Sequence, residues 1–168
     1  MNKQQLKNIG GYILGGILFV VLVPLIMWVV SLPVPAIGIV QYVIASVLSV
    51  IGLSLSIWTI VYMKNVGKGN PMDAFGHAMG KQTSRLMTKG PYHLCRNPML
   101  LGIFIYLIGL CVIFFTWQAL MVFFIFVGIM VVQVITEEKR LRADFGKEYD
   151  EYCAHTGRFI PWVLKISN

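Results

Sequence analysis

Two long stretches without charged side chains limit the folds available to this chain more than any other feature. No Asp, Glu, Lys, Arg or His lies between Lys7 and Lys64, or between Arg96 and Glu137. A helix needs about 20 apolar residues to cross the hydrocarbon core of a bilayer. The first stretch holds 56 residues and the second 40, so each has room for two crossings. The chain is therefore predicted to be an all-α, polytopic membrane protein with four transmembrane helices.

The composition excludes several other classes of protein. Of the 168 residues, 57% are hydrophobic and only 12% are charged, whereas about a quarter are charged in soluble domains. A soluble domain of this size cannot bury so much apolar surface, and a disordered chain would be polar and highly charged. Cys95, Cys111 and Cys153 form no CxxC pair. Neither a disulfide scaffold nor a zinc site is expected, and no other metal site is predicted.

Helix-breaking residues divide each uncharged stretch in two. Pro33 and Pro35 cannot lie inside a helix, so the first stretch is predicted to form helices at about 9–30 and 36–63. The most polar point of the second stretch is residues 116–118. Helices at about 98–115 and 118–138 are expected there, joined as an antiparallel hairpin.

The basic residues predict how these helices are oriented. All 14 Lys and Arg residues lie in the N-terminus, in the middle loop 64–97 or in the tail after 138. Four crossings place these segments on one side, which the positive-inside rule makes the cytoplasm. Both termini are therefore expected to be cytoplasmic, in a plasma membrane such as the bacterial inner membrane. The net charge of +7 is then explained by basic residues that orient the chain in the membrane, so no nucleic-acid partner is predicted. The uncharged helix centres argue against an ion pump or a transporter of charged substrates.

The middle loop ends in residues suited to binding an anion. Asn97 is a good N-cap and Pro98 a good first residue for the third helix, so Arg96 lies just before that helix. Exposed N–H groups and a guanidinium would together favour a carboxylate or phosphate. The alternative is that Arg96 only anchors the end of the helix.

Two acidic residues, Glu137 and Glu138, follow the fourth predicted crossing. The C-terminal end of a helix favours cations, so acids are poorly placed there as structural residues. A carboxylate pair at this position could hold a cation or sugar hydroxyls. The alternative is local pairing, of Glu138 with Arg142 at i+4 and of Glu137 with Arg140 at i+3. Further along, Phe145, Tyr149 and Tyr152 predict a short helix that lies on the interface or caps the bundle.

These two segments together resemble a known family. Residues 90–102 read G-P-Y-H-L-C-R-N-P-M-L-L-G and resemble the signature G-x-Y-x-x-x-R-[HN]-P-x-x-x-G. That signature is typical of the membrane methyltransferases that include isoprenylcysteine carboxyl methyltransferases and phospholipid N-methyltransferases. Residues 137–152 read E-E-x-x-L-x-x-x-F-G-x-x-Y-x-x-Y and resemble the second motif of the family. The resemblance covers residues 64–165, and it sets an N-terminal helix pair (1–63) apart from a methyltransferase region (64–168) that comprises loop 64–97, hairpin 98–138 and tail 139–168.

The resemblance implies a cofactor and a set of site residues. The cofactor is S-adenosylmethionine, converted to S-adenosylhomocysteine and bound at the cytoplasmic face between loop and tail. The residues that match the family's cofactor pocket are Gly90, Tyr92, Arg96, Asn97, Pro98, Glu137 and Glu138. Arg96 and Arg158 would hold an acceptor carboxylate, and Glu138 or His155 would deprotonate an amine acceptor.

The resulting prediction is a methyltransferase like the isoprenylcysteine carboxyl methyltransferases, acting on a membrane lipid or a prenylated small molecule. Asn97, Leu100 and His155 depart from the residues usual in those enzymes, which leaves the acceptor open. The alternatives are a phospholipid N-methyltransferase and a non-enzymatic module that binds a lipid or a partner.

Overall fold

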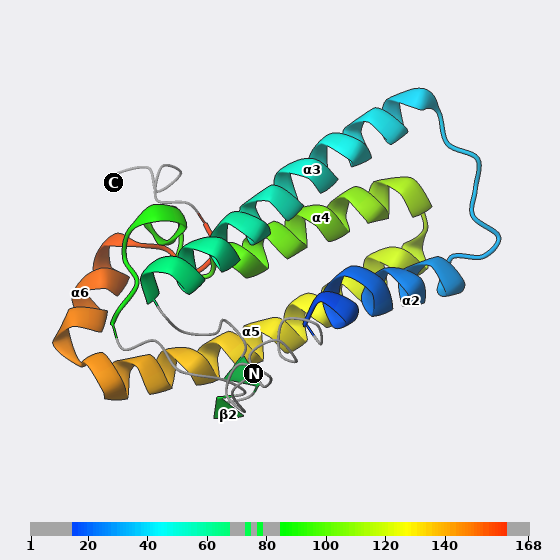
Figure 1. The fold of residues 1–168 in the computed structure, drawn as a ribbon. Coiled ribbons are helices and arrows are strands. Elements are labelled where there is room, and N and C mark those ends of the chain that lie inside the picture. Colours follow the sequence, from blue (N-terminus) through cyan, green and yellow to red (C-terminus); the bar gives the residue numbers. More distant parts are fainter. Residues whose placement is uncertain (1–14, 68–72, 75–76, 79–84, 161–168) are drawn as a thin grey trace, which may run out of the picture.

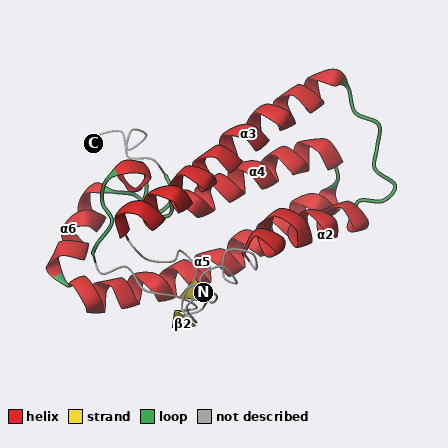
Figure 2. Ribbon diagram, viewed as in Figure 1, coloured by secondary structure: helices red, strands yellow, loops and turns green. Residues whose placement is uncertain are grey.

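A computed structural model describes residues 15–67, 73–74, 77–78 and 85–160 (Figure 1). Helices make up most of these residues (Figure 2), which confirms the all-α class. A two-residue antiparallel ladder was not predicted; it pairs β1 (Asp73–Ala74) with β2 (His77–Ala78). The helical elements are η1 (Ile17–Leu22), α2 (Val23–Val30), α3 (Ile39–Tyr62), η2 (Met63–Gly67), η3 (Gly90–His93), α4 (Pro98–Phe114), α5 (Trp117–Phe145) and α6 (Lys147–His155).

The helices of the structure begin and end close to several of the expected positions. The first predicted helix ends at Val30 as expected, while its expected start at residue 9 lies outside the described residues. Thr116 caps α5, because its hydroxyl accepts a hydrogen bond from the N–H of Ala119 at 3.3 Å. The fourth crossing was expected to end near residue 138, and the helix that carries it, α5, continues beyond that point to Phe145.

Two helical segments are long and apolar enough to cross a membrane: Ile39–Gly67, which joins α3 to η2, and Trp117–Phe145. Two shorter apolar segments, Ile17–Val30 and Pro98–Phe114, accompany them. Many large apolar side chains on these helices face outward, and Ile39 is 76% exposed. Such outward apolar surface is what a lipid environment requires. The four crossings and the cytoplasmic termini stay predictions.

Small residues bring α3 and α4 into backbone contact (Figure 1). A Cβ atom added to Gly52 would collide with the carbonyl oxygen of Gly102, and one added to Gly102 would collide with the Ser56 hydroxyl. That hydroxyl donates to the carbonyl of Met99 across the interface at 2.9 Å. Small residues at such contacts are the usual means by which membrane helices approach closely. The last glycine of the first motif, Gly102, therefore serves helix packing.

The large apolar side chains of the core lie between α2, α4 and α5. Figure 1 shows α4 and α5 diverging from their turn toward the end of the molecule that carries α6. At the opposite end the two uncharged turns meet, because the hydroxyls of Ser31 and Thr116 are 2.6 Å apart in a hydrogen bond. The core residues are Val23, Met27, Leu100, Ile103, Phe104, Leu107, Phe114, Ala119, Phe126, Met130 and Val134.

Candidate active site

A pocket lies where the start of α4 faces the last turns of α5. The space within and in front of it, open solvent at the mouth included, is about 970 Å³. Both motif segments contribute to its wall, although they are about 40 residues apart in the chain. The lining residues are Phe19, Met63, Leu86, Met87, Tyr92, Arg96, Asn97, Pro98, Met99, Leu100, Gln133, Val134, Glu137, Glu138, Leu141, Tyr149 and Tyr152.

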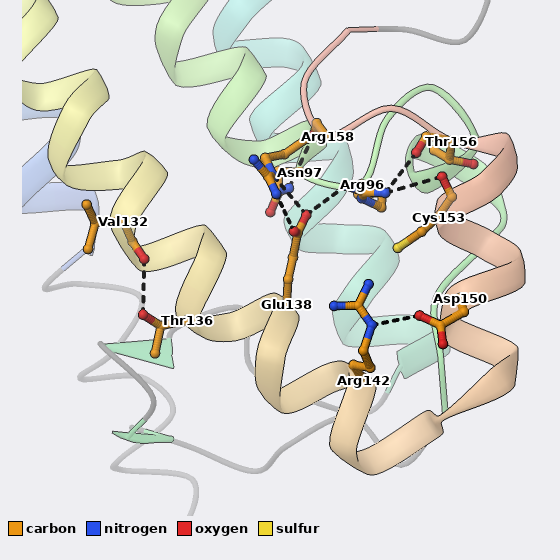
Figure 3. Close-up of polar contacts among 10 residues, drawn as sticks. All are labelled: Arg96, Asn97, Val132, Thr136, Glu138, Arg142, Asp150, Cys153, Thr156 and Arg158. Carbon is orange, nitrogen blue, oxygen red and sulfur yellow. Dashed lines mark hydrogen bonds and ion pairs between the residues drawn. The ribbon is translucent and has the colours of Figure 1, made fainter.

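Two arginines share the Glu138 carboxylate at the edge of this pocket (Figure 3). Arg96 Nη2 lies 3.0 Å from Oε1, and Arg158 donates from Nε to Oε1 at 3.0 Å and from Nη2 to Oε2 at 2.7 Å. The Glu138 and Arg96 side chains are 11% and 13% exposed, while Arg158 is 39% exposed. This pairing replaces the local pair of Glu138 with Arg142 that spacing allowed. The cluster carries two positive charges and one negative charge.

The tail folds back against the start of α4. Arg96 donates from Nη1 to the carbonyl oxygens of Cys153 at 3.4 Å and Thr156 at 3.2 Å (Figure 3). Its backbone N–H donates to Gly157, and the backbone N–H of Asn97 donates to Arg158. These two N–H groups, which lie just before the first turn of α4, are therefore already bonded within the chain. Asn97 occupies the predicted N-cap position, but its side chain donates to the Arg158 carbonyl at 3.2 Å instead of capping α4.

Three tyrosines line the pocket from two segments. Tyr92 lies on η3, and Tyr149 and Tyr152 lie on α6, where the Tyr152 hydroxyl donates to the Tyr92 carbonyl at 2.6 Å. Burial raises the pKa of each phenol above its usual value, and the carboxylate of Glu137 raises the pKa of Tyr92 further. All three are therefore neutral near pH 7. They offer hydroxyl groups and ring faces, not bases.

The remaining acidic residue of the second motif keeps its local partner. Glu137 Oε1 lies 3.7 Å from Arg140 Nη2, so the i+3 pair suggested by spacing is present, and Glu137 also lines the pocket. Arg142 turns away from the pocket and binds Asp150 across the bend at Gly146, with 2.7 Å between Nε and Oδ1 (Figure 3).

Three predicted site residues do not line the pocket. Gly90 adopts a left-handed backbone (φ 63°), and a Cβ there would lie 2.6 Å from the Tyr62 ring, so this motif glycine permits a tight turn against α3. His155 is exposed on α6. Arg158 also lies outside the lining but contacts it through Glu138. The first motif's Pro98 lines the pocket at the first turn of α4.

Several lining residues were missed by sequence reasoning. Tyr149 and Tyr152 carried a signal, their shared face on a charged helix, but this pattern was interpreted as an interface helix. Phe19 and Met63 come from helices interpreted as scaffold, and Gln133 is an amide inside the fourth apolar run. Polar character inside an apolar run could have identified Gln133.

The fold and the site thus define an apolar helical protein with a pocket of mixed polar and apolar lining at one end of its helices. Residues 40–148 match the model of the phospholipid methyltransferase family, and the chain belongs to this family. It is also 28% identical over 82 residues to a curated protein of Alcaligenes xylosoxydans xylosoxydans, the nickel-cobalt-cadmium resistance protein NccN. That alignment covers 49% of this chain and 38% of the relative's length. No solved structure matches the chain. The family model that the chain matches is named for phospholipid methyltransferases.

Proposed function

We propose that the chain is an S-adenosylmethionine-dependent methyltransferase that acts at the cytoplasmic face of a membrane on a lipophilic acceptor. The observation that carries the proposal is the junction of the two motif segments, with Arg96 3.0 Å from Glu138 at a pocket that both segments line. In a chain of this family, such a pocket is the natural place for the cofactor. Its other end lies among apolar helices, where a lipophilic acceptor has access.

The described residues fit the chemistry of this cofactor. Its sulfonium and ammonium groups are cationic, and the ring faces of three tyrosines together with the Glu137 carboxylate favour cations. Its carboxylate suits the arginine cluster, where Arg96 Nε is buried without a hydrogen-bond partner among the described residues. When bound, the cofactor supplies a methyl group, whose bond to sulfur breaks as a lone pair of the acceptor atom forms the new bond. The enzyme contributes mainly by holding acceptor and donor in line.

The contacts favour a carboxylate acceptor, as in isoprenylcysteine carboxyl methyltransferases. A carboxylate is already ionised near neutral pH and needs no base. Of the two bases considered for an amine acceptor, Glu138 is held as a carboxylate by two guanidinium groups and His155 is exposed outside the pocket lining. The alternative is a phospholipid amine N-methyltransferase, which the family's name favours. In that case Glu137, which lines the pocket, is the candidate base that deprotonates the amine.

Calorimetry of purified protein with S-adenosylhomocysteine tests the proposal. We expect binding that weakens about tenfold or more in Glu137→Gln, because a hydrogen bond to a charged group contributes about 1.5–3 kcal/mol. The matched control is Asp150→Asn, since Asp150 is an exposed acid on α6 that does not line the pocket. Folded wild-type protein that releases no heat and shows no thermal shift would support the non-enzymatic module instead.

Isotope-labelled donor then separates the acceptor classes. Incubation with farnesylcysteine analogues or with membrane lipids gives base-labile methyl esters if a carboxylate is methylated. Base-stable products indicate methylation of an amine.

A further inference from the structure

One side chain in the pocket comes from outside the segment that matches the family. Phe19 lies on η1, whereas the family match begins at residue 40. Its ring packs edge-on against Phe126 of α5, with centroids 5.6 Å apart, and Phe126 packs in the same way against Phe104 of α4 at 6.1 Å. Both supporting rings belong to the buried core. Phe19 therefore packs against α5 through Phe126, which Phe104 of α4 supports in turn.

The ring lies at the apolar end of the pocket. The lining residues of α5 run from Gln133 to Leu141, a rise of about 12 Å along the helix. Phe126, which contacts Phe19, precedes Gln133 by seven residues, or about 10 Å, on the side away from the Glu138 cluster. Val134 and Leu100, which also line the pocket, belong with Phe126 to the buried apolar core against which Phe19 packs. The charged and phenolic groups thus mark one end of the pocket, and Phe19 marks the other.

We propose that Phe19 is a specificity-determining residue that limits the size of the apolar group an acceptor can place in the pocket. This inference rests on the proposed function. A lipophilic acceptor must bring its polar reactive atom to the polar end, so the apolar group next to that atom extends toward Phe19. The N-terminal helix, which the family match does not include, thereby selects the acceptor while the matched region carries the transfer chemistry.

Substitution at this position changes the space at the apolar end in both directions. Phe19→Ala removes the ring and Phe19→Trp enlarges it, and neither change touches a charged group. Val21→Ala is the matched control, because Val21 lies on the same helix, is 56% exposed and does not line the pocket. The affinity of each variant for S-adenosylhomocysteine is measured first. An unchanged affinity shows that the polar end of the pocket is still correctly folded.

The test compares acceptors that share a headgroup and differ in apolar bulk, such as S-butylcysteine and S-farnesylcysteine or the matching alkylamines, whichever class the wild type methylates. The readout is the ratio of kcat/KM for the bulky acceptor to that for the small one, in protein reconstituted into lipid vesicles. We expect Phe19→Ala to raise this ratio about tenfold, Phe19→Trp to lower it and Val21→Ala to leave it unchanged.

Two outcomes would overturn the inference. Active Phe19→Ala and Phe19→Trp variants with the wild-type ratio show that the ring does not limit acceptor size, and an equal change in Val21→Ala shows that the effect is not local. In both cases methyl transfer and cofactor binding persist, so the proposed function stands. A wild-type protein that neither binds S-adenosylhomocysteine nor transfers methyl groups refutes the proposed function and this inference with it.

Discussion

The carboxylate of Glu138 compensates two guanidinium groups. Removing its charge should therefore destabilise the protein more than breaking an exposed ion pair does. Glu138→Gln keeps the size of the side chain and removes its charge. The Arg96 guanidinium, only 13% exposed, would then stay buried beside carbonyl groups with no carboxylate. Arg158, at 39% exposure, would regain hydration instead.

The exposure of each partner sets the expected magnitudes. Removing one member of a buried ion pair costs about 3–5 kcal/mol, and the retained amide oxygen of Gln places Glu138→Gln at the lower end of that range, about 3 kcal/mol. Arg158→Gln should cost about 1 kcal/mol or less, because a partly exposed pair contributes little and Arg96 still compensates Glu138. In the Glu138→Gln background, Arg158→Gln should cost almost nothing, since its partner charge is already absent.

Unfolding in mixed micelles with a rising fraction of sodium dodecyl sulfate, followed by circular dichroism, measures these differences. The control is Asp150→Asn, which removes the partner of Arg142 from a pair that is more than half exposed on both sides. The reasoning is refuted if Arg158→Gln destabilises the protein as much as Glu138→Gln does. Equal costs would mean that the exposed arginine, and not Arg96, depends on the carboxylate.

Three further predictions concern packing, reactivity and hydrogen bonding. Gly102→Ala should destabilise the protein by about 1–3 kcal/mol in the same unfolding assay because its Cβ meets α3, whereas Gly128→Ala, with open space around its Cβ, should be neutral or stabilising. Burial raises the pKa of the Cys95 thiol from 9.0 to about 11, so its thiolate fraction at pH 8 falls about 100-fold. Mass spectrometry should show slow alkylation of Cys95 by iodoacetamide that speeds up in denaturant, and equal rates in both conditions would contradict the burial. Tyr152→Phe removes the hydrogen bond to the Tyr92 carbonyl and should lower the free energy of unfolding by about 1 kcal/mol. An unchanged unfolding midpoint would show that this hydrogen bond contributes no net stability.

The uncharged runs and their prolines predicted most helix boundaries because bilayer thickness and proline sterics act locally. The end of α5 could not be predicted in the same way. Hydropathy falls at Glu137, but the helix continues, and ion pairs from Arg140 to Glu137 and to Asp144 support its last turns. A hydropathy pattern registers where a helix becomes polar, not where its backbone hydrogen bonds stop.

The site was predictable where one motif residue meets another. Arg96 and Glu138 were expected to share a pocket, and they lie in contact. The i+4 spacing allowed Arg142 to pair with Glu138. In the structure the bend at Gly146 brings Asp150 next to Arg142, which pairs with it instead. Phe19 had no signal at all, because an aromatic residue in an apolar run looks the same whether it faces lipid or a pocket.

The backbone contact between α3 and α4 has a mechanical consequence. Helices separated by long side chains can slide by changing rotamers, but Gly52 and Gly102 leave no side chains to rearrange between them. The two helices must therefore move as a single rigid body. Any change in the width of the pocket then depends on the opposite wall, formed by the last turns of α5 and by α6, which the bend at Gly146 joins.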